Sequence, residues 1–217
     1  GIFDNIYIEA IIILFMFFGG INFALHSQIV RGNFAGVLKN PEFRSYCSML
    51  IIGILLVTWG LTRVSPDGDA AGAFRSAAFT VVSIQTTTGF VTDDFNLWPE
   101  YLKLLILGMM MIGGCSGSTS GSFKVIRFII LIKIITRELI KLVHPRAIFH
   151  VKVGDKTIDS DDLSNVAALT FLFIGISALS AIMLSFMGVD LTTAISASIA
   201  SLFNIGPGLG GVGAMGN

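Results

Sequence analysis

Residues 85–90 read Gln-Thr-Thr-Thr-Gly-Phe, and residues 204–208 read Asn-Ile-Gly-Pro-Gly. Each stretch follows a short apolar segment rich in small residues, 72–85 in the first case and 190–203 in the second. Both segments are shorter than the roughly 20 residues that a helix needs to cross a bilayer. Glycine adopts backbone conformations that other residues avoid. We therefore predict two re-entrant helices, each ending in an extended tip centred on a glycine.

The composition predicts a membrane protein. The 217 residues are 53% hydrophobic and 13% charged, whereas about 25% of the residues of a soluble domain are charged. Fourteen basic residues balance fourteen acidic ones, which leaves no basic surface for nucleic acid. Two cysteines, Cys47 and Cys115, are too few for a disulfide framework or a four-ligand zinc site. Because the chain begins inside a hydrophobic region, we expect it to be part of a longer protein.

Four segments have the apolar length of a membrane-spanning helix. They cover approximately residues 8–25, 46–61, 101–143 and 163–187. The third segment is too long for one crossing and is interrupted by a run of glycine and serine at 113–121. We therefore predict a half-helix, a break at this run, and a second helix that continues into the cytoplasm.

The charged residues of the short loops predict the orientation, since Lys and Arg concentrate on the cytoplasmic side of a membrane. The loops after the first and third spans are basic, and the opposite loops are acidic. The basic set is Arg31, Lys39, Arg44, Lys141, Arg146, Lys152 and Lys156, and the acidic set is Asp67, Asp69, Asp93, Asp94 and Glu100. Each re-entrant segment must then return to the external face. These patterns predict an all-α polytopic membrane protein of repeated helix–pore loop–helix units, with re-entrant pore helices and one broken transmembrane helix.

The two re-entrant segments align with Gly89 over Gly206, an offset of 206 − 89 = 117 residues. Irregular backbone at membrane depth is tolerated where it is buried in protein or lines a watery cavity. Carbonyl oxygens around a narrow axis replace the hydration shell of a cation, and the C-terminal end of a helix carries partial negative charge. We therefore predict that both tips coordinate a cation. The simpler alternative is that the two glycines only permit tight turns in external loops.

The run between the two halves of the third span contains four glycines. Glycine weakens a helix by about 1 kcal/mol relative to alanine, and serine and threonine compete for backbone hydrogen bonds. We predict an unwound loop that borders the conduction path and acts as a movable barrier. A helix contact of small residues is the alternative. The predicted gating loop consists of Gly113, Gly114, Cys115, Ser116, Gly117, Ser118, Thr119, Ser120 and Gly121.

An ordered set of motifs resembles the transmembrane subunit of Trk-type potassium uptake systems, within the Trk/Ktr/HKT superfamily. The resemblance covers nearly the whole chain. The motifs are Gly-Gly-Ile-Asn-Phe-Ala-Leu-His at 19–26, Gln-Thr-Thr-Thr-Gly-Phe at 85–90, Gly-Gly-Cys-Ser-Gly-Ser-Thr at 113–119, His-Pro-Arg at 144–146 and Asn-Ile-Gly-Pro-Gly at 204–208. One difference concerns residues 121–124, which read Gly-Ser-Phe-Lys where the family usually has Gly-Gly before Ile-Lys.

The resemblance implies four helix–pore loop–helix repeats around one potassium path, of which this chain holds two filter segments. Residues 1–40 correspond to the second-repeat exit helix and a cytoplasmic loop, 41–152 to the third repeat and 153–217 to part of the fourth. The implied filter residues are Thr87, Thr88, Gly89 and Phe90 in the third repeat and Asn204, Ile205 and Gly206 in the fourth.

The resemblance also implies the setting of the protein. The expected location is the inner cell membrane, which the chain crosses several times. The expected partners are a second copy of the chain, as a homodimer, and a cytosolic ring of nucleotide-binding regulatory subunits. Potassium is the expected substrate, moving down its electrochemical gradient, and no covalent cofactor is expected.

Two other classes of function deserve comparison. Gly114-Cys115-Ser116-Gly117 fits the G-x-S-G pattern of rhomboid proteases, whose serine is activated by a histidine, but no histidine is expected at membrane depth. A sodium-coupled symporter also uses broken helices, although it does not need two external tips centred on glycine. Passage of potassium without an organic solute distinguishes the channel-like interpretation from symport.

Overall fold

A computed structural model describes residues 5–64, 69–144, 151–154 and 156–213. Asp67, Pro145 and Arg146, which the sequence analysis singled out, lie outside the described residues, as does the ending of the chain after Gly213.

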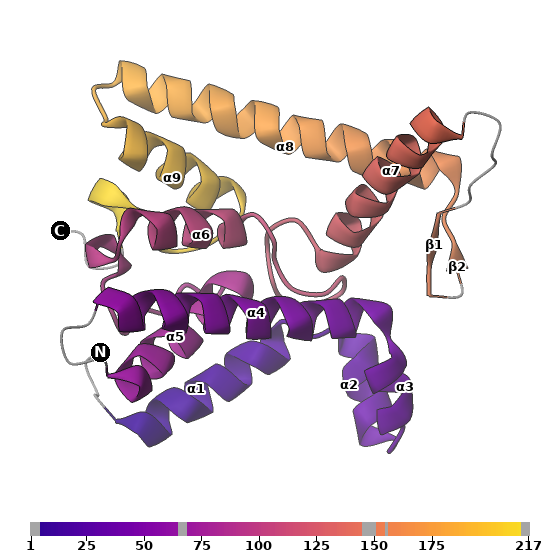
Figure 1. The fold of residues 1–217 in the computed structure, drawn as a ribbon, viewed down its shortest axis with the longest axis horizontal. Coiled ribbons are helices and arrows are strands. Elements are labelled where there is room, and N and C mark those ends of the chain that lie inside the picture. The colour runs from indigo at the N-terminus through magenta and orange to yellow at the C-terminus, as the bar shows by residue number, and fades with distance from the viewer. Residues whose placement is uncertain (1–4, 65–68, 145–150, 155, 214–217) are drawn as a thin grey trace.

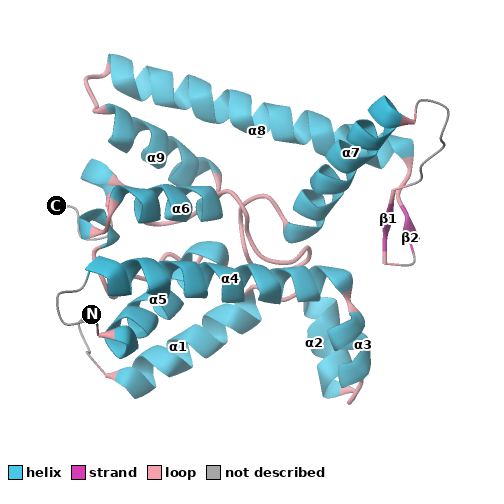
Figure 2. Ribbon diagram, viewed as in Figure 1, coloured by secondary structure: helices cyan, strands magenta, loops and turns pink. Residues whose placement is uncertain are grey.

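The described chain is mostly helical (Figure 2). Its first six elements are α1 (Ile6–Gly19), α2 (Phe23–Val30), α3 (Phe34–Lys39), α4 (Pro41–Val64), α5 (Ala70–Gln85) and the 3-10 turn η1 (Phe95–Leu97). The remaining elements are α6 (Glu100–Met110), α7 (Val125–Val143), β1 (Lys152–Val153), β2 (Lys156–Thr157), α8 (Ser160–Phe186), α9 (Leu191–Leu202) and the 3-10 turn η2 (Gly210–Val212). β1 and β2 form a small antiparallel hairpin, with Lys152 opposite Thr157.

Within the described residues, α4 and α8 are long and apolar enough to cross a membrane. The prediction of a continuous span at 8–25 is wrong, because α1 and α2 meet at a bend of 108°. The bend has a local cause. α1 ends at Gly19 with Gly20 as its C-cap, and Asn22 caps the start of α2, where its side chain accepts a hydrogen bond from the amide of Ala24 at 2.7 Å. Within the part of the chain that the structure describes, two helices are therefore broken where the sequence predicted one.

The other predicted helices are present. The long third span is interrupted as predicted, with α6 on one side of the break and α7 on the other. The two short segments predicted at 72–85 and 190–203 form α5 and α9. Asp69 caps α5 by accepting hydrogen bonds from two backbone amides of its first turn, and Asp190 caps α9 by accepting the amide of Thr193 at 3.0 Å.

The helices divide the molecule into two ends (Figure 1). α1, α5, α6 and α9 begin at one end and stop near the middle, where the loop between α6 and α7 lies. α4 and α8 continue to the opposite end, which carries α2, α3 and the hairpin. Acidic residues lie at the starts of α5, α6 and α9, whereas α3 ends with Lys39. The opposite end also carries Asp161 and Asp162 in the first turn of α8.

The core lies around α5, the C-terminal half of which is covered on all sides. Every residue of α5 from Ala77 to Gln85 is buried, and α5 packs mainly on α4, as α9 packs mainly on α8. By contrast, α8 buries only Leu163 and Val166 along its 27 residues. A helix that is apolar on all sides is typical of a bilayer environment or of contact with further helices.

Candidate filter and gating-loop site

The two tips have the same backbone course. α5 ends at Gln85 and α9 at Leu202, an offset of 202 − 85 = 117 residues. After α5, the amide of Thr88 donates to the carbonyl of Ser83 at 3.0 Å, and the residues 117 positions later repeat this bond between Ile205 and Ala200 at 2.8 Å. The repeat predicted from the glycines is therefore present in the hydrogen bonds.

The same offset relates two unusual backbone angles. Thr87 has φ 57° and Asn204 has φ 58°. Left-handed φ values are uncommon for residues other than glycine, and such strain is a reason to suspect function. Each tip thus turns away from its helix at one residue with a left-handed angle, and the two residues occupy matching positions.

The two tips also touch each other. Gly89 has φ 75°, and a Cβ atom placed on it would lie 2.9 Å from the backbone nitrogen of Gly206 and 3.1 Å from Cδ of Pro207. A Cβ atom on Gly206 would be 3.6 Å from the carbonyl oxygen of Gly89, an ordinary contact. The structure brings together the two predicted glycines and requires a glycine at position 89 for both its angle and its neighbour.

Side chains of α5 fix the first tip. The hydroxyl of Ser83 donates to the carbonyl of Phe90 at 2.6 Å, and the hydroxyls of Thr86 and Thr88 are hydrogen-bonded at 2.8 Å. The Phe90 carbonyl is therefore held by the protein, which sets it apart from the other predicted filter residues. The sequence analysis assigned no role to Ser83, which lies just before the quoted motif, or to Thr86, which lies within it.

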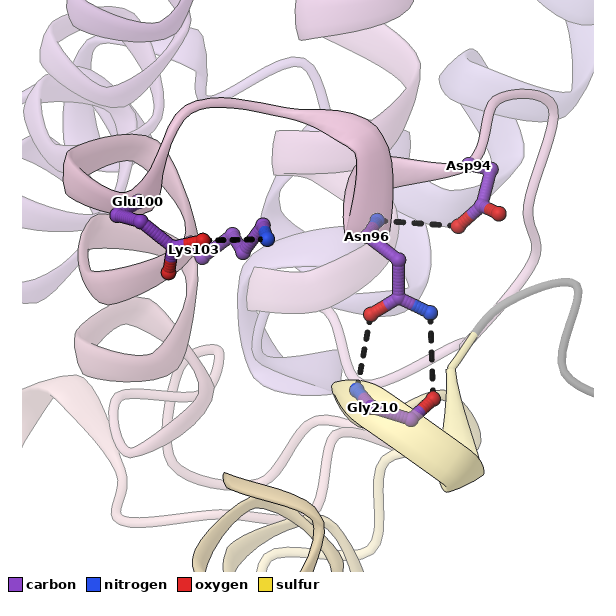
Figure 3. Close-up of polar contacts among 5 residues, drawn as sticks. All are labelled: Asp94, Asn96, Glu100, Lys103 and Gly210. Atoms are coloured by element: carbon purple, nitrogen blue, oxygen red, sulfur yellow. Dashed lines mark hydrogen bonds and ion pairs between the residues drawn. The ribbon is translucent and has the colours of Figure 1, made fainter. Parts of the chain in front are cut away.

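The chain after the first tip holds the chain after the second (Figure 3). The side-chain amide of Asn96 accepts the backbone amide of Gly210 at 2.9 Å and donates to the Gly210 carbonyl at 3.4 Å. Asp94 in turn accepts the amide of Asn96 at 3.0 Å, while the ion pair of Lys103 and Glu100 stays within α6. Nothing in the spacing of the sequence pointed to this link, because Asn96 and Gly210 are 114 residues apart.

A hydroxyl of α9 supports the same segment from the other side. Thr193 accepts the amide of Gly211 at 2.8 Å, and Ser196 both donates to the carbonyl of Leu209 and accepts its amide at 2.9 Å. Hydrogen bonds from Thr193 lower the pKa of the Asp190 carboxyl below its usual range. The chain that follows the second tip is thus held by Asn96 and by polar side chains of α9.

The predicted gating loop is unwound, and it packs against the bend between α1 and α2. The amide of Cys115 donates to the carbonyl of Gly20 at 2.9 Å, and the amide of Thr119 donates to that of Gly19 at 3.2 Å. In return, the carbonyl of Gly117 accepts the amide of Phe23 at 3.0 Å. The free backbone groups of one broken helix are therefore satisfied by those of the other.

The far end of the loop contacts both tips. The amide of Gly121 donates to the hydroxyl of Thr87 at 2.7 Å. The hydroxyl of Ser122 lies 2.9 Å from the Phe203 carbonyl and 3.0 Å from that of Met110. Ser122 has φ 57°, a left-handed angle that is uncommon for residues other than glycine. The two contacts of the Ser122 hydroxyl hold the backbone at this angle.

Two charged residues that the sequence analysis did not assign to the loop also hold it. The carboxylate of Glu42, at the start of α4, accepts the amide of Ser116 at 2.6 Å. The ammonium group of Lys124 donates to the carbonyl of Ser120. Elsewhere, Arg75 of α5 forms a two-pronged ion pair with Glu9 of α1, with nitrogen–oxygen distances of 2.6 and 2.9 Å.

The protease pattern at 114–117 lacks its partner within the described residues. Ser116 is held through its amide by Glu42, and His26 lies 3.0 Å from the carbonyl of Phe18. No cluster of three or more metal-ligating side chains occurs among the described residues. The loop is built from backbone groups and hydroxyls.

Fold and site together define a polytopic α-helical membrane protein. Two related short helices end in tips that meet, and an unwound loop contacts both of them. A family model described as TrkH, cation transport protein, matches residues 1–215. The chain therefore belongs to the TrkH family.

Relatives and a solved structure agree with this assignment. The Trk system potassium uptake protein TrkH of Salmonella typhimurium is 36% identical over 211 residues, which cover 97% of this chain and 44% of the relative. TrkI of Halomonas elongata is 33% identical, with 91% and 40% covered. The crystal structure of the potassium transporter TrkH from Vibrio parahaemolyticus matches with a TM-score of 0.90 and 35% identity over 96% of this chain and 45% of that one. This chain thus spans less than half the length of the relatives it matches.

Proposed function

We propose that this chain contributes two segments of a potassium filter and an intramembrane gate to a potassium uptake protein. The relatives are named potassium uptake proteins. In this proposal Thr87, Thr88, Gly89 and Phe90 form one filter segment, and Asn204, Ile205 and Gly206 form the other. Further filter segments belong to the part of such a protein that this chain does not cover.

One observation carries the proposal, namely the contact between Gly89 and Gly206 at the ends of two helices with matched backbones. Two helix C-termini that converge on one point concentrate partial negative charge there. Carbonyl oxygens at such a point replace water around a cation. External turns with no shared role have no reason to meet, so the contact favours the filter over the simpler alternative.

The loop at 113–121 is the proposed gate. Its end at Gly121 adjoins the tips, with the amide of Gly121 bonded to Thr87 and the adjoining Ser122 bonded to Phe203. Its other end is bonded to the bend at Gly20. Because the segment is already unwound and contains four glycines, it can be displaced without unfolding a helix once its hydrogen bonds break.

We also propose a membrane location, an oligomeric state and a partner, as the family resemblance implies. The protein lies in the inner cell membrane as a homodimer, and a cytosolic ring of nucleotide-binding subunits acts on it. The wide apolar exposure of α8 supports contact with lipid or with further helices. Potassium is the substrate, and no covalent cofactor takes part.

The proposal is tested by ion flux through the full-length protein in liposomes. Potassium flux without any organic solute is expected, and deletion of residues 115–119 is expected to raise it. A well-inserted deletion variant with unchanged flux would remove the gating role. Strict dependence on a solute would instead favour a sodium-coupled symporter.

A further inference from the structure

The start of α7 lacks a cap from its own chain segment. Lys124 occupies the N-cap position and makes no side-chain capping hydrogen bond. The amides of a helix's first turn need acceptors, and here a distant residue supplies one. Oε1 of Glu42 accepts the amide of Ile126, 84 positions later, at 3.3 Å. Negative charge is favoured at such an end, so Glu42 caps α7 from another helix.

The same carboxylate oxygen also holds the predicted gate. Oε1 of Glu42 accepts the amide of Ser116 at 2.6 Å, while it reaches Ile126 in the helix that follows the loop. One oxygen thus ties the middle of the loop to the start of α7. Glu42 is only 8% exposed, so water competes weakly for these bonds.

A lysine strengthens this arrangement. Lys124 lies close enough to Glu42 for their charges to attract, and its ammonium group also donates to the Ser120 carbonyl. The loop is therefore held at Ser116 by the carboxylate and at Ser120 by the ammonium. Both charged groups come from outside the run of glycine and serine.

We propose that Glu42 is the latch that keeps the loop at 113–121 in its closed position. The word "closed" rests on the proposed function, in which the loop is a gate. The role of Glu42 in holding the loop does not depend on that function. Glu42 is a positioning residue, which acts on permeation through the loop. Movement of the loop must break the bond between Glu42 and Ser116, and losing the carboxylate removes this restraint.

Cys115 offers a direct readout of the loop's position. Its side chain is fully buried in the closed loop, next to the residue that Glu42 holds. The full-length protein, with every other cysteine replaced by serine, is treated in liposomes with a thiol-reactive maleimide, and the rate at which Cys115 is modified is measured. Potassium flux is measured on the same preparations.

The expected result for Glu42→Ala is an increase of about tenfold in both the Cys115 modification rate and the potassium flux. Glu42→Gln keeps an oxygen acceptor without the charge and is expected to raise both by a smaller factor. Glu100→Ala is the matched control, because Glu100 lies in the first turn of α6 with a side chain that is 89% exposed. It is expected to leave both quantities unchanged.

An unchanged Cys115 rate in inserted Glu42→Ala protein would overturn the latch. If that variant fails to insert, Glu42→Gln decides, and an unchanged rate there overturns it equally. A faster Cys115 rate with unchanged flux would support the latch and count against the gate in the proposed function. The two failures are therefore distinguishable.

Discussion

Alanine at position 89 is expected to damage the proposed filter far more than alanine at position 206. Gly89 has φ 75°, and a left-handed angle costs a residue with a side chain about 1–2 kcal/mol. The added Cβ would also lie 2.9 Å from a backbone nitrogen, that of Gly206, and overpacking of this kind costs about 1–3 kcal/mol. Neither penalty applies to Gly206, whose Cβ would make a contact at 3.6 Å.

The two penalties sum to about 2–5 kcal/mol, and part of this strain is relieved by moving the tips apart. About 1.4 kcal/mol corresponds to a factor of ten in an equilibrium constant. If strain of that size displaces the Gly89 carbonyl, the preference for potassium over sodium falls about tenfold. Gly206→Ala is expected to cause a clearly smaller loss, because the backbone there has room.

The assay is uptake of radioactive rubidium by liposomes that contain the full-length protein, with sodium as competitor. Gly108→Ala is the control, since a Cβ on Gly108 would meet no atom within 4 Å. Equal effects of Gly89→Ala and Gly206→Ala, or unaltered selectivity in an inserted Gly89→Ala variant, would refute the claim that the close contact at Gly89 sets the geometry of the filter.

Three further predictions concern hydrogen bonds near the tips and the ion pair between α1 and α5. Asn96→Leu removes both bonds to Gly210 and is expected to weaken sodium exclusion, whereas Asn96→Asp, which keeps the accepting oxygen, should weaken it less; identical competition curves for the two variants would argue against the link. Ser122→Gly relieves a left-handed angle but loses the bonds to Met110 and Phe203, so basal potassium flux is expected to rise, and a fall in flux would contradict this. Glu9→Gln removes the charge of the buried carboxylate that pairs with Arg75, and is expected to lower the melting temperature of the solubilised protein, an effect that a Glu100→Gln control should not reproduce.

Much of the fold was predictable because its signals are local. The lengths of the apolar segments predicted α4 and α8, and the run of small residues at 113–121 predicted the break between α6 and α7. The bend at 20–22 was missed for the opposite reason. Apolar residues continue on both sides of the bend, so the composition resembles one span, and the Asn22 cap that starts α2 is a single short-range signal.

The candidate site was predicted in part. Each glycine tip is recognisable from the short helix before it, and the offset of 117 follows from comparing the two. Residues such as Glu42, Asn96 and Ser196 were not predictable, because each acts on a backbone group that is brought to it by the fold. Their partners have no fixed distance along the chain.

The sequence by itself determined that this is a helical membrane protein with two glycine tips and one unwound loop, since hydrophobic length and glycine content act locally. Only the tertiary structure decided that the tips meet at Gly89 and Gly206, and that the loop rests on a second broken helix and on Glu42. The physical reason is that unpaired backbone groups inside a membrane protein must find partners. The chain supplies those partners from wherever packing brings a carbonyl, a hydroxyl or a carboxylate within reach.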